Sequence, residues 1–460
     1  MIHSFKLCGY NIVLDVASGS IHRVDDLAFD VINAYELIID GKDRDVLINR
    51  VSANHKNISR DEIIDVITDV ETLITRGKLF TADTFEDAAG AKYIAPLSAL
   101  CLNVSHVCNM SCAYCFAGCG EQQAEEAASP VSSLMSLETG KKAIDFLVSL
   151  SGERVNLDVD FFGGEPLLNW DVVKDIVRYA REIERKGKKK FRFTLTTNGL
   201  LIDDDVINFT NNQMKTVVLS LDGRPQIHDA MRRLPDGSGS YAAALENIKK
   251  LVEARRGKGY YIRGTYTKSN KDFINDILHI ADLGFKEISM EPVVPSPFPI
   301  LEAADLPELV KQYEILAVEM LRREKLERGF NFYHYNLDLT EGPCVHKRIA
   351  GCGVGTEYMA VTPTGELYPC HQFIGDPGFV LGDVWRGITN SGLKSQFSSC
   401  SVYSRAECRN CWARFYCCGG CSANAYHTSG SINGVYDIGC ELFKKRIECA
   451  IMMQVSKELS

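Results

Sequence analysis

Three cysteines of one short segment, Cys108, Cys112 and Cys115, have the spacing C-x3-C-x2-C. Such a run supplies three thiolates from a single loop, whereas a 4Fe–4S cluster takes four ligands, so one iron is left open. An open iron can bind a small molecule, which makes the cluster a reagent as well as an electron carrier. Structural zinc, the alternative, usually takes two ligands from each of two separated pairs. The spacing therefore favours an iron–sulfur cluster with a vacant coordination position.

A second cysteine pattern occupies the C-terminal third. The chain has 17 cysteines, none of them between Ser129 and Pro343, which indicates a central scaffold with cofactor loops on either side. The later pattern, with Gly365 between its first two members, consists of Cys352, Cys370, Cys408, Cys411, Cys417, Cys421 and Cys440. Clustered cysteines in a protein of the reducing cytoplasm point to metal or redox chemistry. A pair of zinc sites is the alternative here as well.

Between the two cysteine regions, strand-like and helix-like patterns alternate. The strand-like runs are residues 100–104, 155–161, 191–195, 217–221, 260–266 and 287–290. Helical patterns between them include one that begins near Ser136 and one with Val173, Ile176, Val177 and Ala180 on a single face. Alternating β and α units imply parallel strands joined by right-handed crossovers. Six units predict an α/β fold whose core is a partial (β/α)6 barrel, open on one side.

Ligands bind such folds at the carboxyl ends of the strands. Gly163-Gly164-Glu165-Pro166 follows the second predicted strand, Asn198 follows the third and Ser220 the fourth. The glycine pair leaves room for backbone to approach a ligand, and Glu165 can pair with an ammonium group. The segment therefore predicts a binding site opposite the cysteine loop.

Residues 1 to about 85 predict a separate small domain. Three short strand candidates, 5–7, 11–15 and 21–23, are followed by helical patterns at 27–39, near 46–51 and at 60–76. The stretch Asp83 to Lys92, rich in Ala, Asp and Gly, is predicted to be a linker.

Composition excludes several classes of protein. The 460 residues carry a net charge of −9 and the pI is near 5.7, which argues against a nucleic-acid binder. No run of eighteen apolar residues is present, so no membrane span is expected, and the N-terminus lacks the features of a signal peptide. A cytoplasmic location is expected.

The first cysteine motif, with Tyr114 at the aromatic position of C-x3-C-x-aromatic-C, resembles that of the radical S-adenosylmethionine (radical SAM) enzymes. The resemblance implies that the amine and carboxylate of SAM chelate the open iron. It further implies that Gly163, Gly164 and Glu165 hold the methionyl amino group and that Ser220 contacts the ribose.

The C-terminal pattern resembles the SPASM domain of peptide-modifying radical SAM enzymes, which holds two auxiliary 4Fe–4S clusters, so three clusters are expected in all. By this resemblance the distal auxiliary cluster is bound by Cys408, Cys411, Cys417 and Cys440. The nearer one is bound by Cys352, Cys370 and Cys421. Its fourth ligand stays open: either Cys344, eight residues before Cys352, or a thiolate of the substrate completes the set.

The N-terminal segment resembles the winged-helix RiPP recognition element, in which the leader of a ribosomally made peptide adds as an extra strand to a sheet edge. The expected organisation is a leader-binding domain at 1–85, a radical SAM barrel at 95–330 and a SPASM domain at 340–460. These resemblances together cover nearly the whole chain. The chain is most similar to the SCIFF maturases, whose substrates are six-cysteine peptides.

This resemblance implies an enzyme that installs thioether crosslinks in a cysteine-rich precursor peptide. A 5′-deoxyadenosyl radical abstracts hydrogen from a carbon, and a C–S bond then forms. Flavodoxin or ferredoxin is the expected electron donor, and no acid–base catalytic side chain is expected. The alternatives are a formylglycine-forming enzyme of the anaerobic sulfatase-maturing type and a non-catalytic iron–sulfur protein that binds peptides.

Overall fold

One 11-stranded sheet dominates the molecule. The computed structural model describes residues 1–90, 96–116, 134–295, 300–339 and 345–458. The six central strands are parallel and lie at the predicted places: β4 (Ala99–Ser105), β6 (Asn156–Gly163), β7 (Lys190–Thr197), β8 (Thr216–Ser220), β10 (Tyr260–Tyr266) and β11 (Glu287–Pro292). The prediction of an α/β fold built on a large parallel sheet is confirmed.

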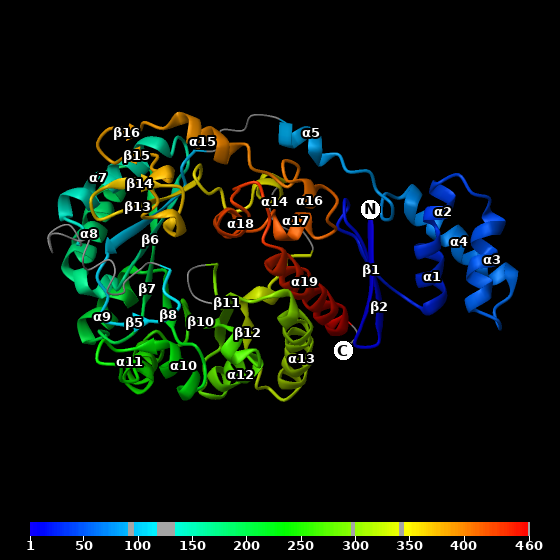
Figure 1. Ribbon diagram of the computed structural model, residues 1–460, viewed down its shortest axis with the longest axis horizontal. Helices are drawn as coiled ribbons and strands as arrows, with labels where there is room; N and C mark the ends of the chain where they lie inside the picture. Colours follow the sequence, from blue (N-terminus) through cyan, green and yellow to red (C-terminus); the bar gives the residue numbers. More distant parts are fainter. Residues whose placement is uncertain (91–95, 117–133, 296–299, 340–344, 459–460) are drawn as a thin grey trace.

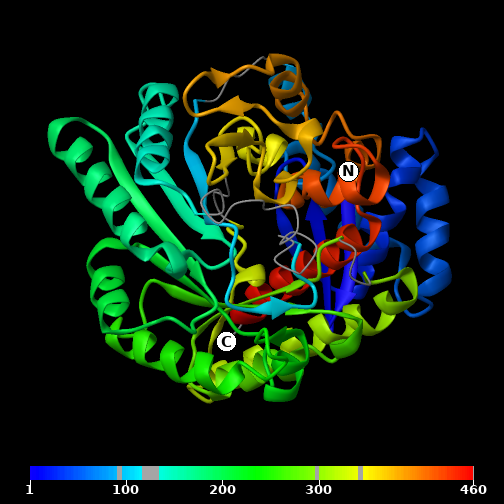
Figure 2. The same cartoon turned by 60° about the vertical axis from the view of Figure 1, so that its left-hand side comes forward.

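Helices cover the outer face of this curved sheet (Figure 2). They are α7 (Leu137–Leu150), α8 (Trp170–Lys186), α9 (Asp204–Gln213), α10 (Pro225–Met231), α11 (Tyr241–Ala254), α12 (Ile274–Asp282) and α13 (Leu306–Lys325). Helix α7 begins after Ser136, whose hydroxyl accepts a hydrogen bond from the Thr139 N–H as an N-cap does. Helix α8 buries the four apolar residues of its predicted face. Local sequence signals thus account for the barrel helices.

The sheet continues beyond the predicted strands at both edges. At one edge β12 (Asn331–Phe332) pairs parallel to β11. At the other edge β13 (Tyr358–Val361) pairs parallel to β4 and is followed by the short antiparallel strands β14 (Glu366–Tyr368), β15 (Gly382–Asp383) and β16 (Gly387–Ile388). The order runs from β12 to β16 without closing on itself. The C-terminal cysteine-rich segment is therefore joined to the barrel by backbone pairing.

The N-terminal segment has its own sheet and its own apolar core. Its strands β1 (Ile2–Leu7), β2 (Tyr10–Asp15) and β3 (Ile21–Val24) are antiparallel. They precede α1 (Asp26–Ala34), α2 (Glu36–Ile39), α3 (Arg44–Asn54) and α4 (Arg60–Thr75). The prediction of a single helix at 27–39 is wrong, because the helix is interrupted at Tyr35. The Tyr35 N–H bonds to the Ile32 carbonyl, and the Tyr35 ring packs on Phe80.

The stretch predicted as a linker is instead held in place. The Asp83 carboxylate accepts hydrogen bonds from the Phe85 N–H, the Tyr403 hydroxyl and the Arg414 guanidinium. Helix α5 (Phe85–Gly90) follows, and the Phe85 and Phe415 rings pack edge to face with their centres 5.1 Å apart. Composition alone pointed to a linker, whereas these contacts across more than 300 residues leave no local trace in the sequence.

The C-terminal segment is a set of short helices followed by one long helix. They are α14 (Val345–Ala350), α15 (Ser391–Ser398), α16 (Ala406–Arg409), α17 (Arg414–Cys417), α18 (Ser422–Ser429) and α19 (Asp437–Lys457). Helix α19 lies between the barrel and the N-terminal sheet (Figure 1). His3 of β1 lies 3.0 Å from the Glu448 carboxylate of α19, and its ring stacks on Trp412 at 3.6 Å. None of the helices in the described ranges is long and apolar enough to cross a membrane.

Candidate functional site

A cavity of about 830 Å³ lies at the carboxyl ends of the parallel strands. The first cysteine loop contributes Cys108, Cys112 and Cys115 to its wall, and the barrel strands contribute Gly163, Gly164, Glu165, Asn198 and Ser220. The opposite wall comes from the C-terminal segment, including Cys352, Cys417, Cys421 and Cys440. The structure therefore brings both cysteine patterns to one shared cavity.

The cysteine loop is fixed against the end of β6 by the glycine pair. The Gly164 N–H bonds to the Ser105 carbonyl and the Glu165 N–H to the Val107 carbonyl. A Cβ on Gly164 would lie 2.2 Å from the Val107 oxygen, and one on Gly163 would lie 2.2 Å from the Ser105 oxygen. The glycines were expected to give a ligand room, and in the structure they let the strand end pack against the base of the cysteine loop.

The far end of the loop is held by a short antiparallel pair that the sequence did not predict. Strand β5 (Ser111–Cys112) pairs with β9 (Arg232–Arg233), and the Ala113 N–H bonds to the Met231 carbonyl. Two-residue strands more than 100 residues apart produce no periodicity from which they can be predicted. The pairing brings Arg232 beside Cys112.

A buried carboxylate organises the loop at Tyr114. The Tyr114 hydroxyl donates to Asp222 Oδ2 at 2.5 Å, and Arg232 Nε donates to Asp222 Oδ1 at 3.1 Å. The Arg232 guanidinium also lies 5.5 Å from the centre of the Tyr114 ring. Asp222 is fully buried, so its charge depends on this cation and these donors. Sequence reasoning missed Asp222, although an Asp-Gly pair at a strand end is a usable signal.

Glu165 is buried and accepts three hydrogen bonds. Its Oε1 accepts from the Leu167 N–H and the Thr197 hydroxyl, and its Oε2 accepts from the Asn198 N–H. Burial is the main cause that raises the pKa of Glu165 to about 7, while these donors oppose the rise. The Asn198 amide in turn donates to the Asn109 side chain in the cysteine loop. A cationic ligand would therefore stabilise the ionised form of Glu165.

The C-terminal thiols fall into two groups of electrostatic neighbours. Cys417 and Cys440 neighbour each other and both Cys408 and Cys411. Separately, Cys370 neighbours Cys352 and Cys421. Cys418 neighbours Cys417 of the first group and Cys352 of the second, while Cys344 lies outside the described residues.

The described residues do not form a single-ion site. No three His, Cys, Asp or Glu side chains among them converge on one metal ion.

A second ion pair joins the C-terminal helix to the barrel. Arg446 of α19 contacts Glu291 at the end of β11 at 3.1 Å and donates to the Tyr313 hydroxyl. Although burial alone would raise it, Arg446 and His334 hold the pKa of Glu291 at about 2. Both Glu291 and Arg446 line the cavity. This bridge sets where the helix that carries Cys440 meets the barrel.

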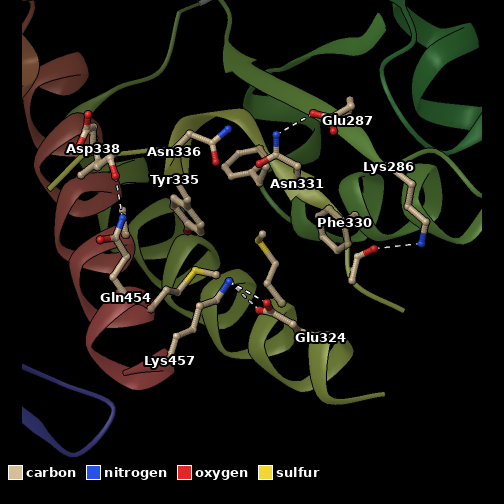
Figure 3. A pocket seen from close by; sticks show the side chains of 16 residues that line it. Lys286, Glu287, Glu324, Phe330, Asn331, Tyr335, Asn336, Asp338, Gln454 and Lys457 are labelled. Carbon is tan, nitrogen blue, oxygen red and sulfur yellow. Dashed lines mark hydrogen bonds and ion pairs between the residues drawn. The ribbon is translucent and has the colours of Figure 1, made fainter. Parts of the chain in front are cut away.

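Another cavity, of about 800 Å³, lies at the opposite ends of β11 and β12. Figure 3 shows several of its polar side chains paired with protein groups: Lys457 with Glu324, Asn331 with Glu287, and Gln454 with a backbone carbonyl. It is lined by none of the cysteines of either pattern. The cavity at the carboxyl ends is the candidate site.

Comparison with known proteins identifies the barrel. Residues 102–283 match the model of the Radical SAM superfamily. This segment is a radical SAM domain. It contains the cysteine loop and the Gly163–Glu165 turn, and the superfamily implies S-adenosylmethionine and a 4Fe–4S cluster.

Two curated relatives extend the similarity beyond the radical SAM domain. The cysteine-type anaerobic sulfatase-maturating enzyme of Clostridium novyi is 25% identical over 76% of this chain and 94% of its own length. The antilisterial bacteriocin subtilosin biosynthesis protein AlbA of Bacillus subtilis is 26% identical over 77% of this chain and 75% of its own.

A solved structure shares the fold of nearly the whole chain. Streptococcus suis SuiB, bound to its precursor peptide SuiA, covers 95% of this chain and 98% of its own, with a TM-score of 0.54 and 16% identity. Together, the radical SAM domain and these relatives fit a radical SAM peptide maturase.

Proposed function

We propose that this protein is a radical SAM maturase that installs thioether crosslinks in a cysteine-rich, ribosomally made precursor peptide. The observation that carries the proposal is the shared cavity, where the SAM-type cysteine loop faces a second group of cysteines across a space large enough for a peptide loop. The similarity to a bacteriocin biosynthesis protein supports a peptide substrate.

In this proposal Cys108, Cys112 and Cys115 hold the 4Fe–4S cluster that binds SAM. Glu165 holds the methionyl amino group, Ser220 contacts the ribose, and Tyr114 fixes the loop through Asp222. When bound, this cofactor pair supplies one-electron cleavage of SAM and a 5′-deoxyadenosyl radical. The protein's own residues orient the two partners and exclude water from the cavity.

Affinity for SAM is expected to rise with pH up to about 7, the pKa of Glu165. Only the ionised carboxylate offers both of its oxygens as hydrogen-bond acceptors to the iron-bound amino group, so each unit below that pH weakens binding by about tenfold. Titration of the unreduced holoprotein with SAM from about pH 6 to about pH 8 checks this. The Glu165→Gln variant should bind weakly and without this pH dependence, and an equally steep profile in the variant would contradict the assignment.

Two auxiliary clusters complete the proposed site. Cys408, Cys411, Cys417 and Cys440 bind the distal cluster, and Cys352, Cys370 and Cys421 supply three ligands of the nearer one. The cysteine pattern assigns no fourth ligand to the nearer cluster; Cys344 and a substrate thiolate are the two candidates that the sequence offers.

In the proposed bond-forming step, the carbon radical of the peptide joins a cysteine sulfur, the thiol loses its proton, and an auxiliary cluster would take up the one electron released. A flavodoxin or ferredoxin supplies the electron that starts SAM cleavage and can receive the one released. Each turnover consumes one SAM and removes two hydrogen atoms from the peptide.

Mass spectrometry of a cysteine-rich peptide incubated anaerobically with reduced enzyme and SAM tests the function. Loss of two hydrogens per crosslink, with resistance of the crosslinked cysteine to alkylation, is the expected result. A mass shift to formylglycine would instead support the sulfatase-maturing activity that the Clostridium novyi relative is named for. Absence of SAM cleavage would support a peptide-binding protein without catalysis.

The proposed leader site is the outer edge of β3 in a winged-helix-like domain of residues 1–85. The order β1-β2-β3 leaves β3 without a neighbour on one side, and β1 faces α19 and Trp412. The Asp15 N–H bonds to the Ser20 carbonyl. Because hydrogen-bonded pairs alternate along an antiparallel ladder, we expect the backbone groups of Ile21 and Arg23 to point outward, where a leader strand can add.

Replacing Arg23 with proline is therefore expected to weaken leader binding by about tenfold or more, because the outward N–H is lost and a net hydrogen bond is worth about 1 kcal/mol before steric clash is added. Edge prolines are tolerated when the missing N–H faces outward. The matched control is Arg23→Ala, which removes the side chain but keeps the N–H. Fluorescence anisotropy of a labelled leader measures both, and equal affinities would argue against strand addition at β3.

A further inference from the structure

The nearer auxiliary cluster of the proposed function has three assigned ligands, and the cavity contains one further thiol. Cys418 is not part of either cysteine pattern, yet it lines the cavity together with Cys352 and Cys421. We propose that Cys418 is the fourth ligand of this cluster, an inference that rests on the proposed function.

Access to the cavity distinguishes Cys418 from the other cysteines outside the patterns. Cys101, Cys400 and Cys449 are buried in the protein interior, and Cys8 is exposed; none of these four lines the cavity. Among the described residues, Cys418 is thus the one cysteine outside the patterns with access to the cluster region.

Packing brings Cys418 next to Cys352. A Cβ on Gly351 would lie 2.9 Å from the Cys418 carbonyl oxygen and 3.6 Å from the Cys418 Cβ, so the backbone just before Cys352 touches residue 418. Cys352 is also the shared electrostatic neighbour of Cys370, Cys421 and Cys418. Cys352 is thus close to thiols from two other segments, Cys370 and the Cys418–Cys421 turn.

The thiol of Cys418 makes no strong contact that would explain its presence. Its sulfur lies 3.6 Å from the Tyr416 carbonyl and 3.9 Å from the Phe415 carbonyl, within its own turn. Its backbone is left-handed, with φ 58°, and Gly419 and Gly420 follow with φ 85° and 72°. Glycine adopts this conformation without cost, whereas the backbone conformation at position 418 disfavours a residue with a side chain.

The left-handed backbone at Cys418 makes glycine a suitable replacement. Cys418→Gly removes the thiol and relieves the backbone, so the metal-free variant should fold at least as well as the metal-free parent by circular dichroism. Cys400→Ser is the matched control for a C-terminal cysteine outside the cavity, and Cys344→Ala tests the rival ligand. Each protein is reconstituted anaerobically, and iron, sulfide and the electron paramagnetic resonance spectrum are measured.

The parent should hold three clusters, or about twelve irons. We expect Cys418→Gly to lose between one and four irons, with loss or conversion of one auxiliary signal, while SAM still perturbs the signal of the first cluster. Cys400→Ser and Cys344→Ala should match the parent. Parental iron content and spectra in Cys418→Gly, or the loss in Cys344→Ala instead, would overturn the inference while leaving the proposed function intact. A parent with a single cluster would overturn both.

Discussion

Serine at Cys108, Cys112 and Cys115 together is expected to reduce the release of 5′-deoxyadenosine from SAM to the background of enzyme-free buffer. The three thiols reach the cavity from one loop, and a hydroxyl is a far poorer iron ligand than a thiolate. Without the first cluster, no electron reaches bound SAM. Liquid chromatography of reactions containing dithionite measures the effect.

Cys8→Ser, at an exposed cysteine far along the chain from these motifs, is the matched control and should keep the parental rate. The triple variant should also retain its fold, because the loop is held by backbone pairing of β5 with β9 and by the glycine contacts. Deoxyadenosine release by the triple variant at a substantial fraction of the parental rate would contradict the assignment of SAM cleavage to this loop.

Arg232→Ala is expected to lower the free energy of unfolding by about 3–5 kcal/mol, because it leaves the Asp222 charge buried without its cation. Arg232 is 13% exposed and Asp222 is fully buried, so the variant leaves Asp222 with hydrogen bonds from the Tyr114 hydroxyl and the Thr265 N–H but without its cation. Urea denaturation of the metal-free protein measures the change.

The neighbouring residue provides the control. Arg233 belongs to the same two-residue strand but is exposed, so Arg233→Ala should change stability by less than about 0.5 kcal/mol. The double variant Arg232→Ala/Asp222→Asn should recover part of the loss, because the uncompensated charge is removed. Equal destabilisation by Arg232→Ala and Arg233→Ala would show that the Asp222 pair does not anchor the cysteine loop.

Local signals in the sequence accounted for the barrel. The strand with alternating Leu157, Val159 and Phe161, the Ser136 N-cap and the apolar face of α8 each depend on residues a few positions apart. These are the ranges over which periodicity and capping act. The structure accordingly places six parallel strands where the alternation predicted them.

Features fixed by distant partners were not predictable in this way. The ion pairs Asp222–Arg232 and Glu291–Arg446 and the anchoring of Asp83 by Arg414 depend on tertiary neighbours. Cys418 lies outside the spacing pattern, and its place in the cavity wall beside Gly351 is visible only in the structure. Motif spacing identified which residue types assemble, while the three-dimensional arrangement shows what holds them there.

Helix α19 has one more consequence, which concerns the peptide. Its first turn carries Cys440 at the cavity, and near its last turn Ser456 meets Tyr10 of the N-terminal sheet. At 1.5 Å per residue its 21 residues span about 30 Å. The proposed leader edge on β3 begins at the cavity end of this helix, because a Cβ on Gly19 would lie 3.9 Å from the hydroxyl of Tyr416, the residue before Cys417 of the cavity wall. A precursor whose leader adds to β3 therefore needs no spacer as long as the helix before its first crosslinked cysteine.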